Sequence, residues 1–413
     1  MIAKTLPLLI GLAALSAAPS CKKKDAGDKP ASEAKDEKSS DDPALGKRRS
    51  GTAHGKSAKE VGDPVGDAHK DGMQPKVTLL ALADYEPMML NLKGCALEGI
   101  EISNGCPAAR QLATARRTAK LGDGVSSLVA KHIKHPAEPV RVHAASLIRS
   151  FRRGGGVPLE PVLNAAKTEE SPAVLAQVAR ALQSVVDTNP GAAKLLLHLA
   201  SHDSPLVRER AAKALVSRQA KAVDGSIEKV IDIVLKDADT NVRTATCRDI
   251  GLRVDDRVLP ALATLIADET AAKKPRLYSA CWLGLAQMIV GRPHFDKSSE
   301  KALELFTKTL AETRCSKEVP PWQVLNDIAS ITAPKLKPIA PWIEKRLPAL
   351  HDALAHVASC RDANKLARSA ALSALGKTGA PAAVMNGLKK ALKSAKGDEA
   401  AAGLLQRIES VKR

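Results

Sequence analysis

A pattern of apolar residues sized for one helix returns along this chain at a nearly constant interval. In the segment HDSPLVRERAAKALVSR, residues 202–218, an advance of about 100° per residue places Val207, Ala211 and Leu215 on one face of a helix. A fixed period of about 20–50 residues is typical of a repeat solenoid. The strong copies start their apolar faces 34, 33, 35 and 35 residues apart, at Val140, Val174, Val207, Val242 and Leu277. Two weaker copies start at Val324 and Ala367.

Each period leaves room for a second helix upstream, such as GAAKLLLHLAS before the segment quoted above. Two short helices cannot bury their apolar faces alone, so neighbouring pairs stack into one continuous core. The shared face is rich in alanine, which suits helix axes about 8–10 Å apart. Aromatic residues make up only 2% of the chain, which fits the same packing. The sequence therefore predicts an all-α fold, an α-solenoid of stacked helix pairs.

The segments DSPLVRERAAKAL and AALSALGKTGAP resemble HEAT repeats, specifically the short subclass named after phycobilisome lyases. That subclass has an Asp-x-x-x-Val-Arg-x-x-Ala-x-x-Ala-Leu-Gly core. The resemblance extends over residues 125–290 and 360–380. The spacing between them is longer and proline-rich, and Tyr278 stands where the subclass has arginine. The resemblance implies the solenoid fold but no single function, because such repeats serve scaffolds, adaptors and a few enzymes.

The N-terminus has the features of an export signal. Lys4, an apolar run and a series of small residues are typical of a secretory signal peptide over residues 1–20, too short for a good spanning helix. Cys21 follows directly, and this arrangement resembles a bacterial lipoprotein signal, in which the cysteine becomes the first mature residue and carries the lipid. Ordinary secretion with cleavage nearby is the alternative. Lys22 stands where aspartate would retain some bacterial lipoproteins in the inner membrane, so an outer-membrane anchor facing the periplasm is preferred.

A highly charged segment with almost no large apolar side chains follows the cysteine. Residues 22–75 hold 12 basic and 11 acidic residues, and this composition cannot bury enough surface to offset the entropy of ordering. We therefore expect a lipidated cysteine and disordered linker over 21–75, an N-terminal helical cap over 76–124, and the repeat solenoid over 125–413. The linker would hold the solenoid away from a membrane.

Six cysteines remain once Cys21 is assigned to the lipid. Cys95 and Cys106 bracket a segment with glycine and asparagine that lies outside the repeats. In an oxidising compartment such a pair is expected to form a disulfide, which stabilises by closing a loop.

The other cysteines carry weaker signals. Cys247 and Cys281 lie on helices of neighbouring repeats at different register positions, so we expect packed thiols rather than a bonded pair. Cys315 and Cys360 lie in turn-like segments and could pair. No pair has the spacing of a zinc ribbon, and CxxC is absent.

Two histidine pairs have the spacing of metal ligands, His132 with His135 and His198 with His202. His135 and His202, however, share one register position with acidic residues of other repeats, which indicates a polar turn. The sequence contains no GxSxG, no HExxH and no complete phosphate-loop motif. Polar residues recur by register instead of converging on one site, so we expect no enzyme, no metal, no cofactor and no small-molecule substrate.

Basic residues recur on the helix face opposite the core. Arg180, Lys213 and Arg248 stand six residues after the apolar start in three consecutive repeats, and Arg210 stands one turn from Lys213. The second helices of such solenoids generally line the concave side, so stacked repeats would turn this column into a basic stripe. Either these residues simply fill solvent positions, or they bind an acidic protein segment or an anionic envelope polymer through charge.

The chain carries a net charge of +18, which suggests anionic partners, but the export signal makes nucleic acid an unsuitable one. These features favour a membrane-tethered, non-catalytic HEAT-repeat scaffold or adaptor that binds another macromolecule in the bacterial cell envelope. The alternative is an enzyme accessory or lyase-like protein, by analogy with the phycobilisome-lyase repeats. A lyase should hold a bilin or thioether chemistry in a groove, and no residue specifies one.

Overall fold

The structure is a computed structural model, and it describes residues 78–121, 124–151, 159–268, 273–290, 297–312, 321–331 and 342–411. The chain divides into two units, Met1–Gly72 and Met73–Arg413, and every described residue belongs to the second. Cys21, the expected signal peptide and the expected linker lie outside the described residues. Among the helices that are described, none is both long and apolar enough to cross a membrane.

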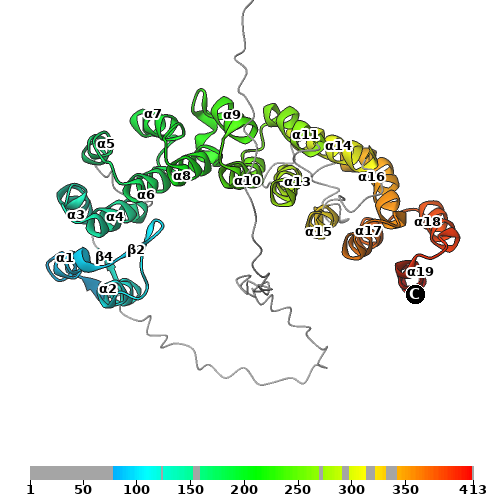
Figure 1. The fold of residues 1–413 in the computed structure, drawn as a ribbon, viewed down its shortest axis with the longest axis horizontal. Helices are drawn as coiled ribbons and strands as arrows, with labels where there is room; N and C mark the ends of the chain where they lie inside the picture. The colour runs from blue at the N-terminus through cyan, green and yellow to red at the C-terminus, as the bar shows by residue number, and fades with distance from the viewer. Residues whose placement is uncertain are drawn as a thin grey trace, which may run out of the picture. The chain divides into compact units, whose positions relative to one another are not determined.

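Helices alternate between two layers in sequence order (Figure 1). In Met73–Arg413, the second helix of each pair lies on the inner side of a curved row and the first helix on the outer side. The inner layer consists of α4 (Glu138–Leu147), α6 (Pro172–Leu182), α8 (Pro205–Leu215), α10 (Thr240–Asp249), α13 (Pro275–Val290), α15 (Trp322–Ile331) and α17 (Lys365–Lys377). The outer layer consists of α3 (Val125–His132), α5 (Glu160–Ala166), α7 (Pro190–Leu199), α9 (Ser226–Lys236), α11 (Leu259–Ala267), α14 (Lys297–Glu312), α16 (Trp342–Ser359) and α18 (Ala382–Ser394). A last helix, α19 (Glu399–Val411), packs against α17 and α18. The predicted all-α solenoid of stacked helix pairs is confirmed.

The repeat register corresponds to the buried face of the inner layer. Ala211 is fully buried, as its place one turn after Val207 requires. Val324 and Ala367, which start the weaker copies, are buried on α15 and α17 and belong to the same layer. The apolar starts of the strong copies are at most 1% exposed: Val140, Val174, Val207, Val242 and Leu277. Inner helices contact their inner neighbours directly, so the small residues of this face set the repeat spacing.

Local chemistry fixes where the helices begin. Pro172, Pro190 and Pro205 each open a helix, at positions where a missing N–H costs little. Ser171 and Asn189 precede two of them and accept hydrogen bonds from the backbone N–H three residues on, at 3.2 and 2.9 Å. These signals are local, which is why the helix pairs follow from the sequence.

The N-terminal part of the described chain combines two helices with short strands. α1 (Leu82–Leu90) and the 3-10 helix η1 (Asn91–Gly94) lead into a small antiparallel hairpin of β2 (Leu97–Glu98) and β3 (Glu101–Ile102). Helix α2 (Pro107–Thr118) follows, and β1 (Thr78–Leu80) pairs in parallel with β4 (Ala119–Leu121). Strand β3 and η1 both contact α4, so this part covers the first repeat.

The expectation of unpaired thiols at Cys247 and Cys281 is wrong. The structure joins them by a disulfide from α10 to α13, with Cα atoms 4.9 Å apart. Two glycines bring these helices together: a Cβ at Gly284 would lie 2.1 Å from the Cys247 carbonyl oxygen, and one at Gly251 would lie 1.9 Å from the Gly284 carbonyl oxygen. The different register positions of the two cysteines did not predict this close approach, which brings them within bonding reach.

Candidate functional site

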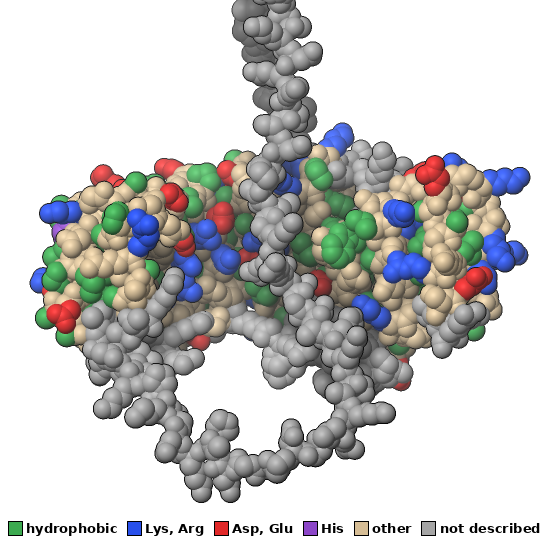
Figure 2. Space-filling view, turned by 90° about the horizontal axis from the view of Figure 1, so that it is seen from below, with side chains coloured by type: hydrophobic (Ala, Val, Ile, Leu, Met, Phe, Trp, Pro, Cys, Tyr) green, Lys and Arg blue, Asp and Glu red, His purple; other side chains and the backbone are tan. Residues whose placement is uncertain are grey.

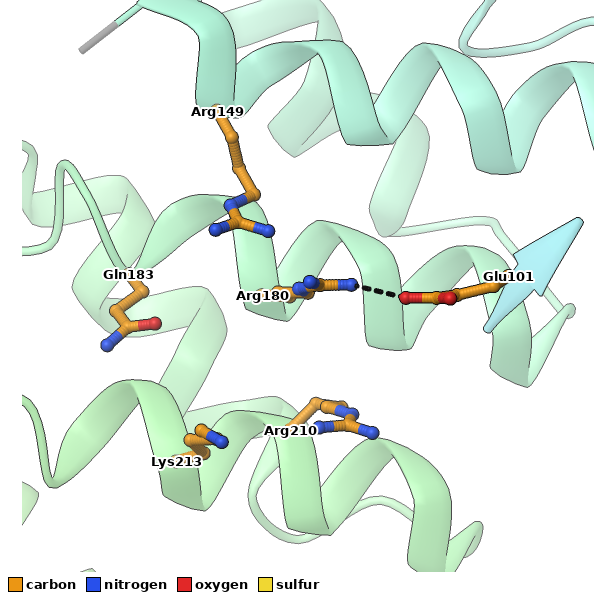
Figure 3. Close-up of a pocket in the computed structure, with 6 residues that line it drawn as sticks. All are labelled: Glu101, Arg149, Arg180, Gln183, Arg210 and Lys213. Carbon is orange, nitrogen blue, oxygen red and sulfur yellow. Dashed lines mark hydrogen bonds and ion pairs between the residues drawn. The ribbon is translucent and has the colours of Figure 1, made fainter. Parts of the chain in front are cut away.

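A hollow of about 280 Å³ lies on the inner layer where α6 and α8 pack together (Figure 3). We call it the basic hollow. Four cations, one carboxylate and one amide line it: Arg149, Arg180, Arg210, Lys213, Glu101 and Gln183. Three of the four residues predicted for the basic stripe are thus brought to one place.

The repeat register positions most of these side chains. Arg180 on α6 and Lys213 on α8 occupy the same offset in consecutive repeats, so stacking of the two helices brings them together. Arg149 lies on the 3-10 helix η2 (Ile148–Phe151) that extends α4, nine residues after Val140. Gln183 is the C-cap residue of α6 and lies nine residues after its own apolar start. At each of these two register positions, consecutive repeats therefore contribute one polar side chain each to the hollow.

Carboxylates pair with two of these arginines. Arg180 Nη1 lies 3.1 Å from Glu101 Oε1, and Arg210 Nη1 lies 3.6 Å from Glu209 Oε1. The buried Nε of Arg210 has no hydrogen-bond partner among the described residues. A buried N–H without a partner is costly. The accessible guanidinium N–H groups of the hollow can form strong, charge-assisted hydrogen bonds to an anionic group.

Arg248 does not line the hollow. Its Nε lies 3.0 Å from Asp249 Oδ1, and Lys213 Nζ lies 3.6 Å from Asp249 Oδ2. The Asp249 side chain is only 9% exposed, and it holds Lys213 and Arg248, two members of the predicted stripe, in place. Among the described residues, the carboxylates of Glu101, Glu209 and Asp249 pair with Arg180, Arg210, Lys213 and Arg248.

Basic side chains are visible on part of the inner face (Figure 2). Figure 2 views Met73–Arg413 from the inner side, and blue side chains gather left of its centre, where α6 and α8 lie in Figure 1. Charged side chains on packed helices are already close to their binding positions, so little conformational entropy is lost when a ligand binds.

The Cys95–Cys106 loop supplies the carboxylate of the site. The structure joins the two cysteines by a disulfide with Cα atoms 5.6 Å apart. Gln177 Nε2 on α6 donates a hydrogen bond of 2.6 Å to the Ile100 carbonyl oxygen, which ties the hairpin tip to the inner layer. Glu101 follows directly and reaches Arg180. The loop thus forms one wall of the basic hollow.

Sequence reasoning missed three residues of this site, Arg149, Gln183 and Glu101. Arg149 was detectable, because it repeats the register of Gln183 one repeat earlier. Glu101 carries no such signal, since its contact with Arg180 spans 79 residues and depends on how the hairpin docks. The other Cys prediction, Cys315 with Cys360, depends on Cys315, which lies outside the described residues.

Three histidines of the two pairs have hydrogen-bond partners within the protein. His135 and His202 each accept a hydrogen bond of 3.0 Å on Nδ1 from the backbone N–H two residues on. Asp237 does the same with its carboxylate, accepting from the Asp239 N–H at 2.9 Å. His132 Nε2 lies 2.6 Å from Glu86, whose pKa is lowered by hydrogen bonds from Lys131 and His132. Within the described ranges no cluster of three or more His, Cys, Asp or Glu could hold a metal.

Comparisons with known proteins identify the repeats. No curated protein matches the chain in sequence. Among solved structures, the chain is similar to the complex of CpcE and CpcF of phycocyanin lyase from Nostoc sp. PCC7120, at 14% identity and a TM-score of 0.32. That match covers 76% of this chain and 99% of the other. Residues 125–216 match the family model for HEAT repeats. The chain is therefore an α-solenoid protein that carries HEAT repeats in residues 125–216.

Proposed function

We propose that this protein is a non-catalytic scaffold, tethered to a membrane of the bacterial cell envelope through Cys21, that holds an acidic segment of a partner protein. The observation that carries the proposal is the basic hollow on the inner layer. Arg180, Arg210 and Lys213 come together there on two packed helices. An extended carboxylate-bearing chain fits such a surface, because each guanidinium can bind a carboxylate through two N–H groups.

Binding suits the hollow better than catalysis. Its lining residues are guanidinium, ammonium, amide and one carboxylate, and Glu101 is already paired with Arg180. Nucleophilic catalysis needs a hydroxyl, thiol or amine activated by an adjacent base, and the lining offers no such pair. Electrostatic recognition needs only the cations, and it gives an association that salt weakens.

The experiment measures binding of a fluorescein-labelled hexaglutamate peptide to the full chain by fluorescence anisotropy. A triple variant, Arg180→Gln, Arg210→Gln and Lys213→Gln, removes three cations of the hollow. We expect its affinity to fall at least about tenfold at low salt, because each exposed ion pair contributes roughly 0.5–1 kcal/mol. Binding to the unaltered chain should weaken steeply as salt rises.

A matched triple variant controls for net charge. Lys134, Lys194 and Lys390 are exposed lysines outside the hollow, and their replacement by glutamine removes the same charge. We expect this control to bind the peptide within about twofold of the unaltered chain, since distant exposed charges are screened. Equal loss in both triples would show that only net charge matters and would reject the site. Tighter binding of polygalacturonate than of the peptide would assign the hollow to an anionic polymer.

A further inference from the structure

A second hollow of about 300 Å³ adjoins the basic hollow and shares Glu101 and Arg180 with it. It lies between α2 and β3 on one side and the inner helices α4 and α6 on the other. We call it the apolar hollow. Its apolar lining consists of Leu92, Ile102, Ala109, Leu112, Ala113 and Val142.

The floor of the apolar hollow is packed and its wall is open. Leu92, Leu112 and Val142 are buried, at no more than 2% exposed. Ile102 is half-buried and Ala113 is exposed, so part of the apolar lining is accessible to a ligand. An accessible apolar surface beside a charged one is typical of a site that takes a ligand with both features.

The wall shared by the two hollows is held in place from both ends. The Cys95–Cys106 disulfide closes the loop, and the Gln177 side chain holds the Ile100 carbonyl oxygen at 2.6 Å. The Glu101–Arg180 ion pair then stands at the junction of the hollows. A fixed wall lowers the entropy lost on binding, so the groove is organised before a ligand arrives.

We propose that the two hollows form one binding groove for a peptide segment of a partner protein in which a leucine-sized apolar side chain precedes or follows a run of acidic residues. The inference rests on the proposed function and specifies its ligand. The apolar side chain occupies the apolar hollow, and the acidic side chains reach Arg149, Arg210 and Lys213. A residue without negative charge separates them, because the Glu101 carboxylate, with its side chain 67% exposed, repels a ligand carboxylate at the junction.

The apolar hollow favours a peptide over a polysaccharide. An anionic sugar polymer offers carboxylates to the basic hollow but no apolar side chain to cover Ile102 and Ala113. A peptide supplies both groups on one backbone, and the polar rim that includes Asn104 and Ser146 lies beside that backbone.

The test compares three labelled peptides of equal length on the unaltered full chain by fluorescence anisotropy. The first is Gly-Leu-Gly-Glu-Glu-Glu, the second has serine for leucine, and the third has glutamine for each glutamate. We expect the first to bind at least about tenfold tighter than the second, since burial of a leucine side chain supplies that much affinity. The third should bind more weakly than the second at low salt.

A second arm fills the apolar hollow. Ala113→Trp places a large side chain in it without changing charge, and Ala383→Trp on the exposed surface of α18 is the matched control. We expect Ala113→Trp to reduce binding of the leucine peptide to the level of the serine peptide and to leave the serine peptide unaffected. Ala383→Trp should change neither.

The outcomes separate this inference from the proposed function. Equal affinity of the leucine and serine peptides would overturn the joined groove while the acidic site stands. Absence of any charge-dependent binding of these peptides to the unaltered chain would overturn both the joined groove and the proposed function. Tighter binding of polygalacturonate or phosphatidylglycerol vesicles than of the leucine peptide would overturn the assignment to a peptide.

Discussion

Arg208 on α8 forms a two-pronged ion pair with Asp237 of the next repeat: Nε lies 2.7 Å from Oδ2, and Nη2 lies 2.8 Å from Oδ1. Burial alone would raise the pKa of Asp237, but the hydrogen bonds from Arg208 and the Asp239 amide outweigh it and lower that pKa. The same arginine also donates to the carbonyl oxygens of His202 and Asp203. Each such arginine therefore fixes its own turn and the following repeat together.

This link recurs in two other repeats of the described chain. Arg141 pairs with Glu169, and Arg368 pairs with Asp398. The repeat between those of Arg141 and Arg208 has Leu175 at the arginine position. The repeat after it has His202 in place of the acid. Arg243 also occupies the arginine position, but its Nε donates to the Val234 carbonyl oxygen at 3.0 Å, so the arginine alone does not make the link.

The Arg368–Asp398 pair is the most buried of these links, with side chains 1% and 3% exposed. We predict that Asp398→Asn lowers the free energy of unfolding by about 3 kcal/mol at neutral pH, because it leaves a buried guanidinium without its counter-charge. Urea unfolding followed by circular dichroism measures this. Asp187→Asn, at an exposed position, is the control and should change stability by less than about 0.5 kcal/mol.

The same pair predicts an acid dependence. Hydrogen bonds from the Arg368 side chain lower the pKa of Asp398 in the folded protein. The stability it provides is present above the unfolded pKa of about 3.9 and is lost as pH falls through the lower folded value. The unaltered chain should therefore lose stability below about pH 4 more steeply than Asp398→Asn does. Parallel curves for the two proteins would contradict the assignment.

Two helical glycines are predicted to respond oppositely to alanine, because only one of them lies at the close approach of α10 and α13. Gly284→Ala would place a Cβ 2.1 Å from the Cys247 carbonyl oxygen, so we expect a loss of about 3 kcal/mol as the helices separate. Gly387→Ala on α18 meets nothing within 4 Å and should gain about 0.5–1 kcal/mol, because alanine restricts the unfolded chain and favours helix. Thermal melting of both variants decides it, and a neutral Gly284→Ala would mean that these helices lie farther apart.

The structure predicts two disulfides. Intact-mass measurements with and without reductant should detect them, because reduction changes the mass of a disulfide-bonded chain and not that of free thiols. Peptide mapping without reductant should recover Cys95 joined to Cys106 and Cys247 joined to Cys281. The second bond closes 34 residues of chain, so Cys247→Ser with Cys281→Ser should cost about 3–4 kcal/mol. Recovery of Cys247 and Cys281 as free thiols from the purified protein would show that they are packed cysteines and not a bonded pair.

The lipid anchor is tested by fractionation. Cys21→Ser should release the protein from the membrane fraction into the soluble periplasm, because several acyl chains together hold a protein far more firmly than one. Detergent partitioning separates the two forms. Partitioning that does not change on substitution would indicate that another feature attaches the protein.

The solenoid follows from local residues. A stripe such as Val207, Ala211 and Leu215 sets a helix face, Pro205 sets its start, and repetition at a constant interval sets the stacking. The alignment of Arg180 with Lys213 follows from the same register, which is why part of the basic hollow was predictable. Each of these signals acts within one helix or between equivalent positions of adjacent repeats.

Contacts that depend on how separate segments dock were not predictable in this way. Glu101 contacts Arg180 because the hairpin is held against α6 by the hydrogen bond from Gln177. Arg248 forms an ion pair with Asp249 beside the hollow and does not line it. Cys247 reaches Cys281 because glycines let two backbones approach. Register fixes the direction of a side chain on its own helix, whereas the distance between two segments depends on every side chain packed between them.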